Sequence, residues 1–264
     1  LKNDTWGRTG DVLGLIQTSF RRSAMSLLQK VHERFNIVNS LMWAASTTKP
    51  SMEVVYRELF LRDLARLGLD DLYYPVGWAA NHSLMYLIAR CFIELPVVNV
   101  LELGAGQSSI LLSQLNDRLK RDATIMTVEH DPQWADRIQR QVKHRVVVTS
   151  LVPKTVDSHR IQHYEEYLDP SAHYDFVLID GPPANRNNET AFNRLGAVEV
   201  LAKNLAESFV LIVDDAERHG EDMLVELIRR KLRTDGREFR ETAIMAAKQQ
   251  HVFAAGSCSN AGFF

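Results

Sequence analysis

The feature that most constrains the fold is an alternation of short apolar runs with longer amphipathic stretches, which begins after Tyr74-Pro75. The apolar runs span residues 97–103, 124–129, 146–149, 176–180 and 209–214. Stretches with helical spacing lie between them at 108–119, 133–142 and 190–205. Uninterrupted apolar runs are typical of strands buried on both faces, and their alternation with helices predicts βαβ units in a parallel, doubly wound sheet.

The C-terminal part departs from this alternation. After a helix expected at 221–232, residues 239–255 resemble two strands joined by a short polar turn near 248–250. Because no helix separates these two strands, they are expected to form an antiparallel hairpin at the sheet edge. The expected fold class is therefore α/β, with a doubly wound, mostly parallel sheet and a C-terminal antiparallel hairpin.

The N-terminal part has a different pattern. Apolar residues recur at helical spacing from residue 11 to about 45, with basic residues between them. Residues 47–51 contain Lys49-Pro50 and predict a linker, and a second helix is expected at 52–67. We therefore expect an N-terminal helical extension over 1–70 and the α/β domain over 71–264. The basic amphipathic helices suit packing on the main domain, a homo-oligomer contact or, less commonly, a membrane surface.

Composition narrows the class of protein. The 31 Lys and Arg residues nearly balance the 33 Asp and Glu residues, so no charge surplus favours a nucleic-acid partner. Cys91 and Cys258 lie far apart without metal-site spacing, which predicts reduced thiols and a cytoplasmic location. No apolar run reaches the length of a transmembrane segment. A small-molecule substrate is the partner we expect.

Ligands of open α/β sheets bind at the carboxyl ends of the strands. The first strand ends in LELGAGQSS at 101–109, where Gly104 and Gly106 permit a tight turn and let backbone N–H groups approach a ligand. A glycine turn required only by sterics is an equally good interpretation of this segment alone. The second strand then ends in Glu129, which suits two hydrogen bonds to a ribose diol. Its alternative role, at a helix N-terminus, is filled more naturally by Asp131.

With these motifs the sequence resembles the class I S-adenosylmethionine-dependent methyltransferases over about residues 74–255. The motifs are VLELGAGQSS, TVEHDP, YDFVLIDGPP and FVLIVDDAER. The resemblance implies a Rossmann-like fold with S-adenosylmethionine as cofactor. It implies that Glu102, Gly104 and Gly106 surround the methionine part, that Glu129 holds the ribose, and that Ser150 and Leu151 lie near the adenine.

Ser108 stands where this family's pattern has its third glycine. A serine leaves room for a hydroxyl at the cofactor but less room for a dinucleotide pyrophosphate. We therefore count Ser108 among the cofactor-binding candidates, and its presence argues against NAD.

Acidic residues follow the fourth and fifth predicted strands. Asp180 ends the fourth, with roles as base, cofactor ligand, metal ligand or loop cap all open, and Asp214-Asp215 end the fifth. We take Asp180 and Asp214 as catalytic candidates. The three acids partly resemble the metal-dependent O-methyltransferases, which makes Asp180, Asp214 and Asp215 candidate ligands of Mg²⁺ or another divalent cation. Asp215 replaces the family's amide, and Pro183 replaces its lysine. The alternative to a metal is a helix cap and an exposed acid paired with Arg218.

Methyl transfer from a sulfonium is an in-line displacement that needs alignment and, for a hydroxyl, removal of a proton. We expect a methyltransferase acting on an oxygen of a small hydroxylated metabolite or sugar. Its rivals are an N-methyltransferase, a nicotinamide-dependent oxidoreductase and a non-catalytic binding module. Residues 73–82 are either a cofactor lid or a hydrophobic plug. The cationic residues that could serve an anionic substrate, or remain surface charge, are Arg186, Arg194 and Arg218.

Overall fold

The computed structural model describes residue 42 and residues 46–77, 79–185 and 189–264. The chain divides into two compact units, Leu1–Ser46 and Thr47–Phe264. Nearly all of the helix predicted at 11–45 lies outside the described residues. The second unit begins at the predicted linker rather than near residue 70. Helix α2 (Met52–Leu67) belongs to it because α2 packs on α3 (His82–Glu94), where the rings of Tyr56 and Tyr86 are 5.4 Å apart.

The core of the second unit is a seven-stranded sheet in the order β3-β2-β1-β6-β7-β9-β8. Its strands are β1 (Asn99–Leu103), β2 (Thr124–Glu129), β3 (Arg145–Val148), β6 (Tyr174–Ile179), β7 (Leu205–Val213), β8 (Arg240–Met245) and β9 (Gln249–Ala255). Strands β3, β2, β1, β6 and β7 pair in parallel with their neighbours, whereas β9 runs antiparallel to both β7 and β8. The predicted doubly wound, mostly parallel sheet with a C-terminal hairpin is confirmed.

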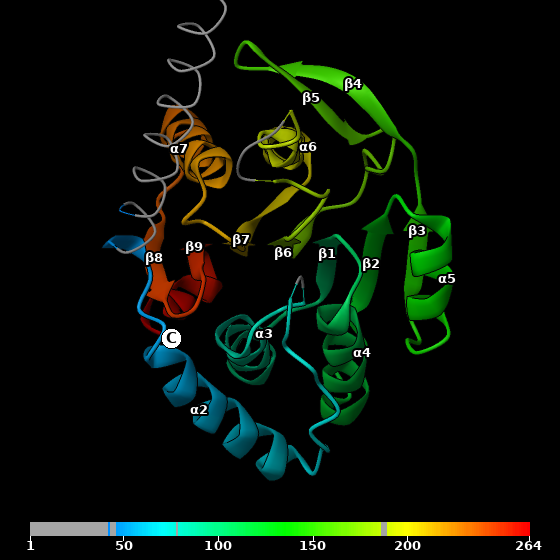
Figure 1. Cartoon of the computed structure of the whole chain (residues 1–264), viewed down its shortest axis with the longest axis vertical. Helices are drawn as coiled ribbons and strands as arrows, with labels where there is room; N and C mark the ends of the chain where they lie inside the picture. The colour runs from blue at the N-terminus through cyan, green and yellow to red at the C-terminus, as the bar shows by residue number, and fades with distance from the viewer. Residues whose placement is uncertain (1–41, 43–45, 78, 186–188) are drawn as a thin grey trace, which may run out of the picture. The chain divides into compact units, whose positions relative to one another are not determined.

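Helices cover both faces of this sheet (Figure 1). The remaining helices are α4 (Gln107–Leu119), α5 (Pro132–Gln139), α6 (Glu199–Lys203) and α7 (His219–Thr234), with 3₁₀ helices η1 (Asn193–Val198) and η2 (Gly256–Phe263). Helices α3 and α4 lie on one side of the sheet, and α6 and α7 lie on the other. The single helix expected at 190–205 is instead η1 followed by the short α6.

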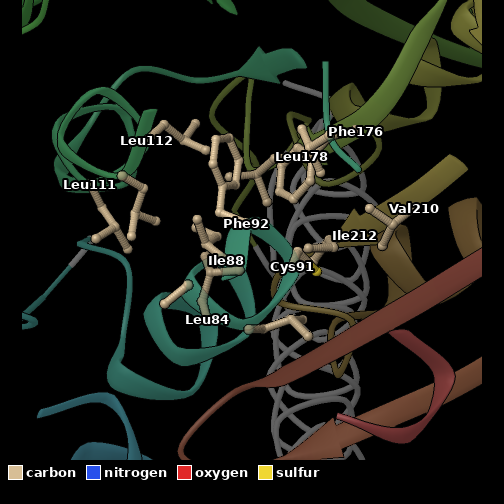
Figure 2. Packing of buried hydrophobic residues seen from close by; sticks show 14 of the residues in the cluster. Leu84, Ile88, Cys91, Phe92, Leu111, Leu112, Phe176, Leu178, Val210 and Ile212 are labelled. Carbon is tan, nitrogen blue, oxygen red and sulfur yellow. The ribbon is translucent and has the colours of Figure 1, made fainter. Parts of the chain in front are cut away.

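Alternate residues of each central strand enter two different cores. On β6, Phe176 and Leu178 face α3 and α4, whereas Val177 and Ile179 belong to the cluster that includes α7 residues. Figure 2 shows Phe92 of α3 beside Phe176 and Leu178, and the ring centroids of Phe92 and Phe176 are 5.6 Å apart. Burial on both faces explains why these strands read as continuous apolar runs.

One helix and one β-hairpin were not predicted from the sequence. Helix α3 begins after Asn81, whose side chain accepts a hydrogen bond from Leu84 N, and nine of its 13 residues are apolar, most of them buried. The antiparallel pair β4 (Leu151–Val156) and β5 (His159–Tyr164) is a separate two-stranded sheet. Its turn residues, Asp157 and Ser158, have φ of 46° and 70°, a two-residue turn formed here without the usual glycine.

Two expectations about the chain can be compared with the described residues. Among them, no helix is long and apolar enough to cross a bilayer. Cys91 and Cys258 are both buried, free cysteines.

Candidate active site

A cleft of about 800 Å³ opens where the glycine turn after β1 meets the loops that follow β2, β6 and β7. The predicted site residues that line it are Gly104, Gly106, Ser108, Glu129, Asp180 and Asp215. This is the sheet edge at which open α/β folds bind ligands. The volume lies in the usual range for a small-molecule site.

The two glycines after β1 have different roles. Gly104 has a φ of 95°, and a Cβ atom there would lie 2.9 Å from Gly181 N, so this position excludes a side chain. Gly106 is extended and is the N-cap of α4, and a Cβ atom there would meet only Ser108 Oγ, at 3.9 Å. Gly104 therefore allows the loops after β1 and β6 to touch, whereas Gly106 leaves open space beside the cleft.

Glu129 reaches the cleft from the end of β2, and only 5% of it is exposed. Its Oε2 atom accepts a 3.1 Å hydrogen bond from Ala105 N, and its Oε1 atom accepts from the backbone N–H groups of His130 and Asp131. The carboxylate is therefore fixed against the glycine loop.

Asp131, and not Glu129, caps the helix that follows β2. Its side chain accepts hydrogen bonds of 2.8 Å from Gln133 N and 3.1 Å from Trp134 N at the start of α5. Trp134 donates from Nε1 to Ala105 O at 2.7 Å and also lines the cleft. The role of helix cap, which was the alternative for Glu129, therefore belongs to Asp131.

Three predicted cofactor ligands do not line this cleft. Glu102 is fully buried beneath it, where Oε2 accepts hydrogen bonds from Ser109 Oγ at 2.6 Å and Thr127 Oγ1 at 2.7 Å. Burial raises the pKa of Glu102 to about 7. Ser150 is exposed, and Leu151 begins β4. Their cofactor contacts stay predictions.

The segment ahead of α3 packs against the rest of the protein at Tyr73 and lines the cleft at Tyr74 and Val76, and its role as a cofactor lid stays a prediction. Tyr73 is buried against α2 and donates a 2.5 Å hydrogen bond to Gln114 Oε1, as expected of a plug. Tyr74 is exposed and lines the cleft with Val76. Gln107 accepts from Tyr74 N at 2.5 Å and donates to Tyr74 O at 2.7 Å, which holds this segment against the glycine loop.

The structure brings Asp180, Asp214 and Asp215 together, as their positions after adjacent parallel strands predict. One carboxylate oxygen from each lies within 4.8 Å of the others. Asp180 and Asp215 line the cleft, whereas Asp214 is fully buried behind them.

Three cationic side chains already neutralise these acids. Lys248 Nζ is 3.1 Å from Asp214 Oδ2 and 3.1 Å from Asp215 Oδ1. Arg194 extends one guanidinium nitrogen to Asp180 Oδ1 and another to Asp215 Oδ2, each at 3.1 Å. Arg218 lies 2.8 Å from Asp215 Oδ1. Arg194 and Arg218 are therefore neither isolated surface charges nor unpaired cations, and Arg186 lies outside the described residues.

This arrangement does not fit a divalent cation. Each carboxylate oxygen of Asp214 and Asp215 has a nitrogen atom within 3.1 Å, because Gln250 Nε2 also donates to Asp214 Oδ1 at 2.7 Å. A metal would have to displace these groups and would add two positive charges beside Lys248 and Arg194.

Two acids of this cluster hold protons more tightly than usual. Burial, together with the Asp214 carboxylate, raises the pKa of Asp180 to about 8 against the opposing effect of Arg194. Burial likewise raises the pKa of Glu221, which lies 3.5 Å from Arg194, to about 7. Of the two, Asp180 lines the cleft, and its pKa suits proton transfer near neutral pH.

Several further residues at the site were missed from the sequence, and Trp134 of α5 is one of them. Lys248 lies in the turn between β8 and β9, and Gln250 lies on β9, about 35 residues after the acids they contact. Tyr164 ends β5 and lines the cleft with a buried hydroxyl that has no hydrogen-bond partner among the described residues. The turn residues near Lys248 indicated only a chain reversal, and no strand was predicted over the β4–β5 hairpin.

No protein-family model matches the sequence, and no curated protein matches it. Solved structures with a similar chain path include an O-methyltransferase from Bacillus cereus in complex with SAH, 18% identical, with coverage of 82% of this chain and 100% of that chain and a TM-score of 0.40. The O-methyltransferase TomG from Streptomyces achromogenes in complex with SAM is 17% identical, with coverage of 85% and 98% and a TM-score of 0.39. A methyltransferase from Geobacter sulfurreducens is 13% identical, with coverage of 75% and 86% and a TM-score of 0.44.

Proposed function

We propose that this chain is an S-adenosylmethionine-dependent methyltransferase that methylates an oxygen of a small hydroxylated metabolite or sugar. The observation that carries the proposal is the continuity of one cleft from the Gly104–Ser108 turn and Glu129 to Asp180. A ligand carboxylate or hydroxyl at the turn would meet backbone N–H groups at the start of α4. Glu129 would accept hydrogen bonds from a ribose diol, and the flat face of Trp134 would suit the adenosine.

The other half of the cleft suits the acceptor. Asp180 lies on it, and Arg194 fixes one of its carboxylate oxygens. In the proposed reaction the acceptor oxygen attacks the methyl carbon, the carbon–sulfur bond breaks, and its electron pair stays on sulfur. The hydroxyl proton moves to the Asp180 carboxylate, so that atoms and charges balance. The raised pKa of Asp180, about 8, makes it a stronger base than an ordinary aspartate once it is ionised.

Calorimetric titration with S-adenosylhomocysteine (SAH) and, separately, NADH tests the cofactor. We expect SAH to bind and NADH not to bind. Replacing Glu129 with alanine should weaken SAH binding by on the order of 1.5–3 kcal/mol through lost charge-assisted hydrogen bonds. The matched control is Glu207→Ala, because Glu207 is exposed near the start of β7, at the opposite end of the strand from the cleft.

The outcomes separate the rival functions. Binding of NADH alone would identify an oxidoreductase, and binding of neither would identify a non-catalytic module. Unchanged SAH affinity in folded Glu129→Ala would remove the ribose assignment. Incubation of the enzyme with labelled S-adenosylmethionine and a metabolite mixture, followed by NMR of the product, would show whether the new methyl group is on oxygen or nitrogen.

The near balance of 31 basic and 33 acidic residues supports a small-molecule acceptor rather than a nucleic acid. The buried free thiols of Cys91 and Cys258 support a reducing, cytoplasmic location. The N-terminal helices remain our proposed contact for a homo-oligomer. Light scattering of the full chain and of a chain beginning at Thr47 would test that contact.

A further inference from the structure

The acids at the ends of β6 and β7 need a cation, and the turn between β8 and β9 supplies one. Lys248 reaches two of the three carboxylates at 3.1 Å, and 16% of its side chain is exposed. Buried carboxylates are stable only when paired. The ammonium group of Lys248 therefore stands among the same oxygen atoms that a hard divalent cation would use.

The charges of the whole cluster support this interpretation. Three cations lie among four acids: Lys248, Arg194 and Arg218 with Asp180, Asp214, Asp215 and Glu221. The cluster therefore carries one excess negative charge if every group is ionised, and a single retained proton makes it neutral. An added divalent cation would give the cluster a net charge of +1 with every acid ionised, or +2 with one proton retained, and a net charge is unfavourable where water is excluded.

The position of Lys248 is fixed by the rest of the fold. Ala246 N donates to Lys248 O at 2.9 Å and closes the turn. Glu53 of α2 accepts a 3.2 Å hydrogen bond from Ala247 N, and the backbone N–H of Lys49 donates to Ala246 O at 2.9 Å. The segment around α2 therefore holds the turn that carries Lys248.

We propose that Lys248 takes the place of the divalent cation expected beside Asp180, Asp214 and Asp215, so that an internal ammonium group organises this acid cluster and no metal is bound there. Lys248 is a positioning residue. It holds Asp214 and Asp215, and Asp215 in turn fixes the Arg194 guanidinium that orients Asp180. The consequence that methyl transfer needs no metal rests on the proposed function, whereas the cation site itself does not.

Titration with Mn²⁺, followed by electron paramagnetic resonance and by thermal melting, tests the proposal without an activity assay. The wild-type protein should show no saturable Mn²⁺ binding, and neither Mn²⁺ nor EDTA should shift its melting temperature. Lys248→Met keeps the length of the side chain but removes its charge, so this variant should melt lower, gain Mn²⁺ binding and be stabilised by the ion. Lys248→Arg should behave like the wild type. Lys231→Met is the matched control, because Lys231 pairs with Asp235 on the surface.

Two results would overturn the proposal: saturable Mn²⁺ binding by the wild type that Asp214→Asn abolishes, or a folded Lys248→Met that gains no Mn²⁺ affinity. If Lys248→Met does not fold, the wild-type titration still decides. SAH binding, measured on the same samples, separates a failure of this proposal from a failure of the methyltransferase assignment. Where turnover is measurable, Mn²⁺ should restore part of the rate lost in Lys248→Met and should leave the wild-type rate unchanged.

Discussion

Gln250 donates a 2.7 Å hydrogen bond from Nε2 to the buried Oδ1 atom of Asp214. Its own Oε1 atom accepts a 2.7 Å hydrogen bond from Ser83 Oγ at the start of α3. Asn81 donates to Ser83 Oγ and, through the same side-chain amide, to Glu53 of α2. A chain of polar side chains thus connects Glu53 of α2 to Asp214, the acid that is buried behind the cleft.

Removing Gln250 should therefore destabilise the protein. In Gln250→Leu, Asp214 Oδ1 and Ser83 Oγ each lose a partner without access to water, so we expect a loss of about 2–4 kcal/mol in the free energy of unfolding. Urea unfolding measures the change. The control is Gln162→Leu, since Gln162 is exposed on β5 and should change stability by less than about 0.5 kcal/mol. Equal losses in the two variants would show that the chain of polar groups has no special importance.

Gly104→Ala should destabilise the protein more than Gly236→Ala does. Both glycines have a positive φ, but only the added Cβ at Gly104 meets neighbouring atoms. The new Cβ would lie 2.9 Å from Gly181 N and 3.0 Å from Gly181 Cα, in addition to the strain of a φ of 95°. Gly236→Ala isolates the strain, because Gly236 has a φ of 68° and nothing within 4 Å of the added atom. We expect about 1 kcal/mol for Gly236→Ala and at least about 2–3 kcal/mol for Gly104→Ala in chemical denaturation.

Gly106→Val should retain the fold, because a Cβ at Gly106 meets no backbone atom within 4 Å. The same substitution places a side chain beside the cleft and should weaken SAH binding by about tenfold or more. Melting temperature and calorimetry give the two readouts. Normal affinity in a folded Gly106→Val would show that the glycine turn is not the cofactor loop.

Glu102 should make the free energy of unfolding depend on pH. Its pKa is about 7 in the folded protein and 4.5 as an ordinary glutamate, so the folded state retains a proton that the unfolded state releases. Stability should therefore fall as pH rises from about 4.5 to about 7, by up to about 3 kcal/mol, and this contribution should be constant above that range. Glu102→Gln cannot ionise, so the fall in stability between about pH 5 and about pH 8 in urea unfolding should be smaller than in the wild type, and the raised pKa values of Asp180 and Glu221 account for the slope that remains. The same slope in both proteins would assign the effect to other groups.

Asp180 should set the pH dependence of the reaction. A base must be deprotonated, and burial together with Asp214 raises the pKa of Asp180 to about 8, so the rate should increase as pH rises through this value. The rate of Asp180→Asn should no longer depend on pH in this range, and its kcat should be about 10²–10⁴-fold lower than that of the wild type. EDTA should not change the wild-type rate. Full activity of both Asp180→Asn and Asp214→Asn would remove the acids from the mechanism.

Local sequence patterns determined most of the sheet and one part of the site. Strands β1, β2, β3, β6 and β7 follow from continuous apolar runs, because strands buried on both faces need no alternation. The convergence of Asp180 with Asp214 and Asp215 followed from their places at the ends of neighbouring parallel strands. Helix α3 was missed because its residues from Leu84 to Ile93 form an almost continuous apolar run, and such a run by itself does not distinguish a buried helix from a buried strand.

Only the tertiary structure decided how the acids are neutralised. Lys248 and Gln250 come to Asp214 because β9 runs antiparallel along β7, with His251 paired to Val213, and this pairing leaves no mark in the local sequence around either partner. Likewise, Tyr164 reaches the cleft only through the pairing of β4 with β5. Sequence periodicity reports which face of an element is buried, whereas the identity of the side chain across a contact depends on strand order and register, which the whole chain sets together.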